Sequence, residues 1–126
     1  MSQRITIRIG DRSAEAELND CDCAKKIWAA LPIEAVANTW GEEVYFDISV
    51  RCELSDDARE DVAVGELGYW PTGTAFCIFF GRTPASGPDG RPRAASKVNP
   101  IGHLIGDARV FEKVRDGEKI VLSGKT

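Results

Sequence analysis

Aromatic side chains are the residues of this sequence best suited to a binding site, because they can wall an apolar pocket into which a few polar groups project. The predicted ligand pocket contains four aromatic residues and the single histidine: Tyr45, Trp70, Phe76, Phe79 and His103. Trp70 stands before Pro71 at the end of a strand-like stretch, which favours the rim of a pocket. Phe76 and Phe79 belong to the most apolar run of the chain, so the ordinary hydrophobic core is their alternative location.

His103 is the only histidine of the chain, and two kinds of role are open to it. An imidazole that titrates near neutral pH can act as a general base or donate a hydrogen bond to a carbonyl group. A purely structural role within a strand is the alternative. Because there is no second histidine, a conventional histidine metal site cannot form, and we expect neither a metal nor a cofactor.

The four cysteines allow redox or metal chemistry only at one place. Cys21 and Cys23 flank the start of a predicted helix, where a thiol can become reactive or bind a soft metal. One intervening residue strains a disulfide between them, and no second pair of ligands follows at zinc-finger spacing. Cys52 and Cys77 are interpreted as small core residues. Because the N-terminal residues lack the apolar segment of a secretory signal, we expect reduced thiols and a cytoplasmic protein.

Composition and charge exclude several classes of protein. The formal net charge of -4 and the pI near 5.0 give no basic field that would favour nucleic acid. No apolar run approaches the roughly 20 residues that span a bilayer. At 43% hydrophobic and 29% charged residues, the chain has the composition of a globular domain.

Two charged segments are predicted to be connections between strands. Residues 53–61 are acidic but lack the residue order of a calcium loop, so we expect solvated surface. Residues 81–97 contain three prolines and no hydrophobic periodicity, which indicates a long loop. That loop could gate a pocket, bind an acidic partner or be a simple surface excursion.

Hydrophobic periodicity predicts the elements that must position these residues. Alternating apolar residues indicate strands, whereas Ala24, Ile27, Trp28 and Leu31 recur at helical spacing and predict one short α-helix around 20–31, ended by Pro32. The predicted strands cover 5–9, 14–18, 33–40, 43–50, 62–70, 75–80, 98–105 and 119–122. About eight short strands and one clear helix imply a mainly β, mostly antiparallel barrel or sandwich, with residues 1–126 as a single domain.

Four segments in this order resemble the cyclophilins, and in particular a small prokaryotic cyclophilin-like group. The most specific are Gly68-Tyr69-Trp70-Pro71 and Phe79-Phe80-Gly81-Arg82-Thr83-Pro84, and residues 41–46 and 99–106 complete them. The resemblance covers nearly the whole chain. It implies a closed, mostly antiparallel cyclophilin-like β-barrel.

The resemblance also frames the function. True cyclophilins isomerise X-Pro bonds with the arginine of a Phe-His-Arg sequence, but Tyr45-Phe46-Asp47 occupies the comparable stretch here. We therefore expect a binding module for a peptide or small molecule rather than an enzyme, with no oligomeric state implied. One alternative is a peptidyl-prolyl cis-trans isomerase that uses Arg51, Arg82 or His103. A further alternative is a subunit of an amide-hydrolysing assembly, which would need a protein partner.

Overall fold

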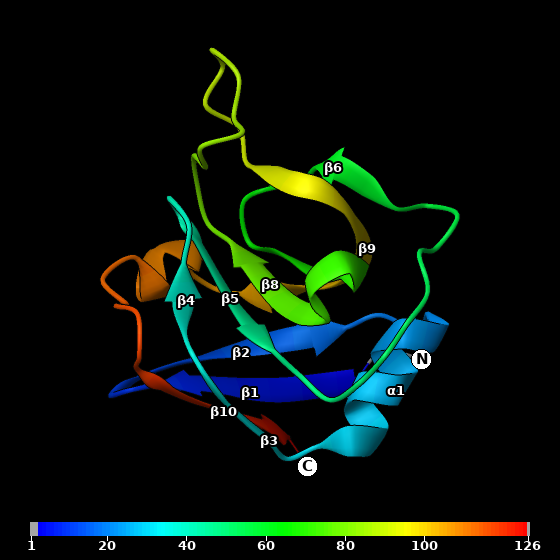
Figure 1. Cartoon of the computed structure of the whole chain (residues 1–126). Coiled ribbons are helices and arrows are strands. Elements are labelled where there is room, and N and C mark those ends of the chain that lie inside the picture. The colour runs from blue at the N-terminus through cyan, green and yellow to red at the C-terminus, as the bar shows by residue number, and fades with distance from the viewer. Residues whose placement is uncertain (1–2, 126) are drawn as a thin grey trace.

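Ten strands, one α-helix and two short 3-10 helices make up residues 3–125, the part of the chain that the computed structural model describes (Figure 1). In chain order the elements are β1 (Gln3–Ile9), β2 (Arg12–Leu18), α1 (Asp22–Ala30), β3 (Ile33–Val36), β4 (Asn38–Thr39), β5 (Glu43–Asp47), β6 (Arg59–Asp61), β7 (Glu66–Trp70), η1 (Pro71–Gly73), β8 (Ala75–Phe79), β9 (Arg93–Ile105), η2 (Ala108–Phe111) and β10 (Lys119–Gly124). Between residues 3 and 125 no helix is both long and apolar enough to cross a membrane.

The strands pair antiparallel in the order β3-β10-β1-β2-β9-β7-β8-β5-β4, and β6 pairs separately with β9. The sheet is therefore not closed, in contrast to the predicted closed barrel of about eight strands. The two end strands, β3 and β4, are successive parts of one extended segment and cannot pair with each other. Ala37 separates them and instead exchanges backbone hydrogen bonds with Gly117 and Glu118, at 2.9 Å each.

The side chains of strand β8 belong to two hydrophobic clusters, one on each face of the sheet. Its five residues are all buried, and side chains alternate between the two faces of a strand. Phe76 faces the main core, where its ring stacks on Phe46 with 5.1 Å between centroids. Cys77 and Phe79 face a smaller cluster on the other side of the sheet.

The long connection before β9 is shorter than the sequence predicts. β9 begins at Arg93, inside the segment 81–97 that we expected to be a loop, because Arg93 and Val98 pair with Asp61 and Arg59 of β6. The exposed residues of both strands carry no apolar alternation, so the periodicity gave no signal. The predicted helix around 20–31 is confirmed as α1, with Cys21 as its N-cap.

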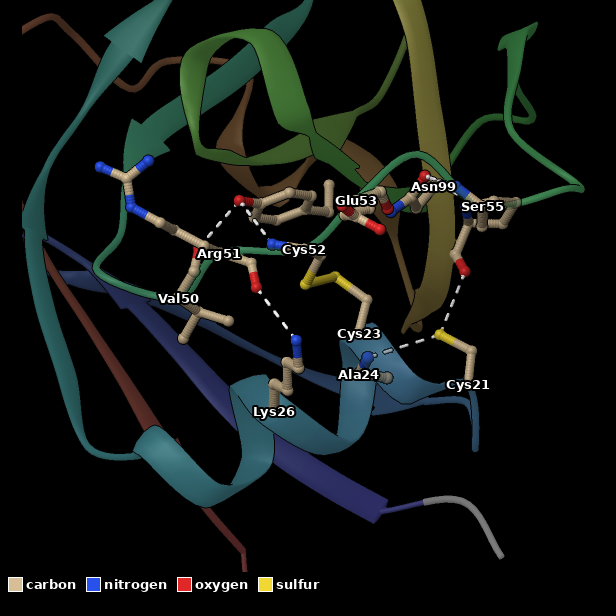
Figure 2. The surroundings of a disulfide bond; sticks show 12 residues. Cys21, Cys23, Ala24, Lys26, Val50, Arg51, Cys52, Glu53, Ser55 and Asn99 are labelled. Carbon is tan, nitrogen blue, oxygen red and sulfur yellow. Dashed lines mark hydrogen bonds between the residues drawn. A yellow bond between two sulfur atoms is a disulfide. The ribbon is translucent and has the colours of Figure 1, made fainter.

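A disulfide joins Cys23 of α1 to Cys52 in the loop after β5, with 5.6 Å between the Cα atoms (Figure 2). The expectation of reduced thiols, and of Cys52 as a plain core residue, is therefore wrong. The two residues are 29 positions apart, and only the fold brings them together. Cys21 and Cys77 keep free thiols.

We expect Gly102→Ala to destabilise the protein by about 2 kcal/mol, because a new methyl group must displace packed backbone. A Cβ atom at residue 102 would overlap the carbonyl oxygen of Glu17 and approach Leu18 Cα at 3.0 Å, both in β2. Urea denaturation measures the change. Gly87→Ala is the matched control, since its Cβ would meet nothing closer than Asp89 Oδ1 at 4.0 Å. Equal stabilities of the two variants would contradict the prediction.

Candidate ligand pocket

A cavity of about 150 Å³ opens over the smaller hydrophobic cluster. We call it the Glu43 pocket, and it is lined by Trp40, Glu43, Tyr45, Trp70, Cys77, Ala94, Ala95 and Val98. Strands β5, β7, β8 and β9 supply all of these residues except Trp40, which follows β4. Tyr45 lies opposite Cys77 in the β5–β8 register, and Glu43 shares the face of Tyr45 because strand side chains alternate.

Three half-buried aromatic side chains form the walls of the Glu43 pocket: Trp40, Tyr45 and Trp70. The indole Nε1–H of Trp70 donates a hydrogen bond to Ser96 Oγ at 2.6 Å, which fixes the orientation of that ring. Tyr45 and Trp70 also pack against the smaller cluster from the pocket side. Two of the three walls, Tyr45 and Trp70, are thus held in place by their packing.

Glu43 is the unusual residue of the pocket, because its side chain is a carboxyl group with only 5% of the residue exposed. Burial raises the pKa of Glu43 to about 7, and a hydrogen bond with the Cys77 thiol opposes this increase only partly. Burial and the nearby Glu43 carboxyl likewise raise the pKa of Cys77, so its thiol stays protonated. No ion pair between the described residues involves Glu43.

The structure brings two of the predicted pocket residues together at this site, Tyr45 and Trp70. Phe79 lies beneath them as a fully buried member of the smaller cluster, and Phe76 lies in the main core. His103 does not line the pocket: its side chain, 60% exposed, lies 3.8 Å from Glu17 on β2.

Glu43 was missed in the sequence analysis, although a signal for it exists. Its separation of two from Tyr45 places both side chains on one face of a strand. The available clue was a carboxyl group on the same strand face as a predicted pocket aromatic. Val44 and Phe46, which alternate with Glu43 and Tyr45, point to the other face of that strand.

The model of the family described as cyclophilin-like matches residues 3–123. The chain belongs to the cyclophilin-like family. A solved structure of a hypothetical protein from Archaeoglobus fulgidus is similar to it, with 35% sequence identity, a TM-score of 0.84, and coverage of 98% of this chain and 95% of that chain. Together they place the chain in a small prokaryotic cyclophilin-like family. No match was found among curated proteins.

Neither arginine proposed for catalysis in this cyclophilin-like protein lies among the residues that line the Glu43 pocket. Arg51 is exposed in the loop after β5, where its carbonyl oxygen accepts a hydrogen bond from Lys26 Nζ at 3.3 Å (Figure 2). Arg82 is exposed as well, and its guanidinium donates to the carbonyl oxygen of Gly87 at 3.2 Å. The structure does not bring His103, Arg51 and Arg82 to the pocket.

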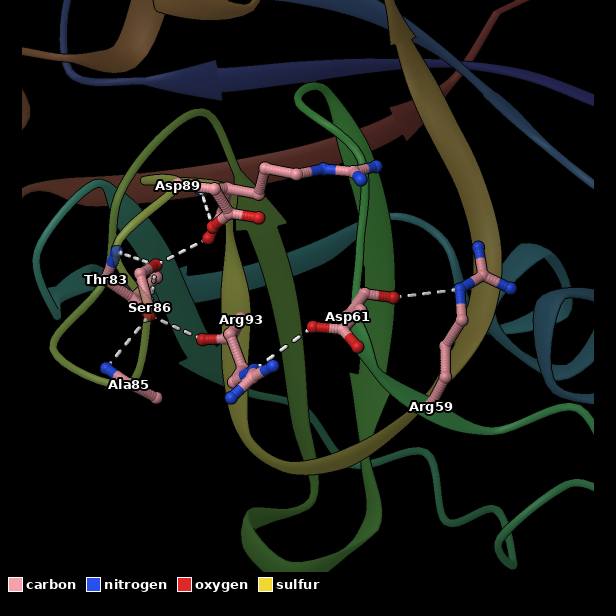
Figure 3. Close-up of polar contacts among 8 residues, drawn as sticks. Arg59, Asp61, Thr83, Ala85, Ser86, Asp89 and Arg93 are labelled. Carbon is pink, nitrogen blue, oxygen red and sulfur yellow. Dashed lines mark hydrogen bonds and ion pairs between the residues drawn. The ribbon is translucent and has the colours of Figure 1, made fainter.

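The connection from β8 to β9 is held by polar contacts rather than lying free over the pocket (Figure 3). Ser86 Oγ accepts from the backbone N–H of Thr83 at 2.9 Å and donates to the carbonyl oxygen of Arg91 at 2.6 Å. Arg93 Nε lies 3.1 Å from Asp61 Oδ1 and ties the start of β9 to β6.

A second, charged groove of about 360 Å³ lies between β6 and this connection. Its residues include three arginines and three acidic residues, namely Arg59, Arg91, Arg93, Asp61, Glu66 and Asp89. Ion pairs join Arg59 to Glu66 and Arg93 to Asp61, so most of these charges already have partners. Among residues 3–125 no group of three or more histidine, cysteine or acidic side chains could hold a metal ion. We therefore take the Glu43 pocket as the candidate functional site.

Proposed function

We propose that this cyclophilin-like protein is a binding module whose Glu43 pocket takes an apolar group of a peptide or small-molecule ligand. The observation that carries the proposal is a buried carboxyl group, Glu43, set among three aromatic walls in an open pocket. Burial of an ionisable group without a charged partner opposes folding, and such groups cluster at functional sites. A pocket that is apolar with few polar groups is the usual form of a small-molecule site.

The size of the Glu43 pocket limits what enters it. An apolar cavity of about 150 Å³ accommodates a molecule the size of benzene, and the Glu43 pocket has about this volume. A five- or six-membered ring or a branched aliphatic group therefore fits, and the rest of a larger ligand would extend outward past Ala95, which is exposed at the rim.

The isomerase alternative requires a cationic donor that reaches the prolyl amide nitrogen. The residues that line the Glu43 pocket include no lysine, arginine or histidine, so this chemistry finds no donor there. We therefore favour binding over isomerisation. The further alternative of an amide-hydrolysing assembly stays a prediction, and a stable complex with a second protein in a pull-down would test it.

NMR titration tests the proposed function with three probes of suitable size: cyclopentanol, cyclopentylamine and N-acetylproline methylamide. We expect at least one probe to shift the indole N–H signals of Trp40 and Trp70 in a saturable manner, because both rings line the pocket. Trp28, which packs on the main core, is the internal control and should not shift.

A blocked pocket separates specific binding from general effects of the probe. Ala95→Phe places a ring at the exposed rim and is expected to abolish the saturable shifts. Lys97→Phe adds the same ring at an exposed position two residues along β9, outside the pocket lining, and should leave them intact. Absence of shifts with all three probes, or equal shifts at Trp28, would overturn the proposal.

A further inference from the structure

We propose that the Glu43 pocket recognises the positively charged ammonium group of an organic amine, with the Glu43 carboxylate as its counter-ion. This inference rests on the proposed function and names the chemical class of its ligand. Three features of the pocket carry it: the buried carboxyl group, the lack of a cation in the lining, and the aromatic walls.

Glu43 lacks the partner that a buried carboxylate needs. A buried charge is tolerated when a countercharge and hydrogen-bond donors surround it. The neutral Cys77 thiol is a weak donor and carries no countercharge. Since no lining residue carries a positive charge, a ligand can supply the countercharge that the ionised carboxyl lacks. An ammonium group provides both the charge and up to three donors.

The aromatic walls favour the same ligand. A cation close to the face of tryptophan or tyrosine is attracted by the ring quadrupole, and tryptophan is the strongest of these partners. Trp40, Tyr45 and Trp70 line the pocket together with Glu43. A neutral apolar ligand would further desolvate the carboxylate without pairing it, and an anion would be repelled. Of neutral, anionic and cationic ligands, only a cation is therefore favoured by both the carboxylate and the aromatic rings.

The pH dependence of binding follows from the groups that face Glu43. The ionisable residues of the lining besides Glu43 are Tyr45 and Cys77, and the Cys77 pKa is raised well above 9.0. Because burial raises the pKa of Glu43 to about 7, this carboxyl group loses its proton near neutral pH. The affinity for a permanently charged amine should therefore rise between pH 6 and pH 8, roughly tenfold per unit below the midpoint.

Calorimetric titration of cyclopentylamine and cyclopentanol tests the inference, because the two probes share a ring and differ in charge. We expect the amine to bind wild-type protein at pH 8 about tenfold to hundredfold more tightly than the alcohol, from the charged hydrogen bonds and the cation–π contact. Glu43→Gln should remove this preference by weakening binding of the amine, and it should not weaken binding of the alcohol. Glu42→Gln is the matched control, since the adjacent Glu42 pairs with Arg109 and does not line the pocket.

The outcomes distinguish the inference from the function on which it rests. Equal affinity for the two probes in wild-type protein would overturn amine recognition and leave the pocket as a site for neutral groups. Absence of binding by both probes, and by N-acetylproline methylamide, would overturn the proposed function itself. If Glu43→Gln does not fold, the pH dependence of the wild type tests the inference instead. From pH 6 to pH 8 the affinity for the amine should rise and the affinity for cyclopentanol should not, and an amine affinity that does not rise would overturn the inference.

Discussion

We expect Glu43→Gln to abolish the pH dependence of stability that Glu43 causes. The wild-type protein should lose about 3 kcal/mol of its free energy of unfolding between pH 4 and pH 8, and the variant should not. Burial raises the pKa of Glu43 from 4.5 to about 7 in the folded protein. Between these values the folded state keeps a proton that the unfolded state has released, so stability falls as the pH rises. Below 4.5 both states are protonated and the penalty is absent, while above 7 both are ionised and it is complete.

Urea denaturation of the wild type and of Glu43→Gln at pH 4, 6 and 8 measures this effect. The free energy of unfolding of the variant, relative to that of the wild type, should increase steadily as the pH rises. Glu42→Gln is the control of opposite sign: the hydrogen bond with Arg109 lowers the pKa of Glu42, whose stabilising contribution is present at high pH and lost on acidification. A Glu43→Gln variant that differs from the wild type by the same amount at all three pH values would show that the carboxyl group is not desolvated.

Loss of the Cys23–Cys52 disulfide is expected to destabilise the protein by about 3 to 4 kcal/mol, the chain-entropy estimate for a bridge across 29 residues. The bond ties α1 to the loop after β5, whose backbone is also held by Tyr69. The Tyr69 hydroxyl donates to the carbonyl oxygen of Val50 at 2.8 Å and accepts from the N–H of Cys52 at 3.2 Å (Figure 2).

The double variant Cys23→Ser/Cys52→Ser, compared with the wild type by urea denaturation without reductant, measures the contribution of the disulfide. Cys21→Ser is the matched control, because Cys21 lies two residues away with a free thiol and is not part of the bond. Its thiol accepts a hydrogen bond from Ala24 N–H at 3.4 Å and donates one to the carbonyl oxygen of Pro100 at 3.7 Å. A serine hydroxyl can make both bonds, so a small effect is expected there. Stabilities of the double variant and the wild type within about 1 kcal/mol would contradict the account, since that falls well below the usual effect of a native disulfide.

Local hydrophobic patterns predicted those parts of the fold whose faces differ in polarity. Ile5, Ile7 and Ile9 alternate with polar residues, and all three are fully buried in β1. Residues 75–80 carried no alternation and were correctly interpreted as buried on both faces. Where exposed residues pair, as between β6 and the start of β9, the pattern carried no information and the strands were missed.

Features that depend on long-range geometry could not be predicted in the same way. The Cys23–Cys52 bond follows from where the fold places two residues that the sequence separates by 29 positions. The open sheet follows from one extended segment that supplies both end strands. Tyr45 and Trp70, which line the pocket, were predicted because aromatic side chains suit an apolar pocket, whereas a glutamate next to a turn is most often solvated. Only its 5% exposure distinguishes Glu43 from the adjacent, partly exposed Glu42.

The most direct test of the Glu43 pocket is the 13C chemical shift of the Glu43 side-chain carboxyl carbon, followed against pH with and without cyclopentylamine. The signal is assigned by its absence from Glu43→Gln. We predict a titration midpoint near 7 in the free protein and a shift to lower pH by about one unit or more when the amine is bound, because the ammonium group stabilises the carboxylate. A midpoint that stays near the ordinary glutamate value of 4.5 and does not respond to the amine would show that Glu43 is neither buried nor part of a binding site.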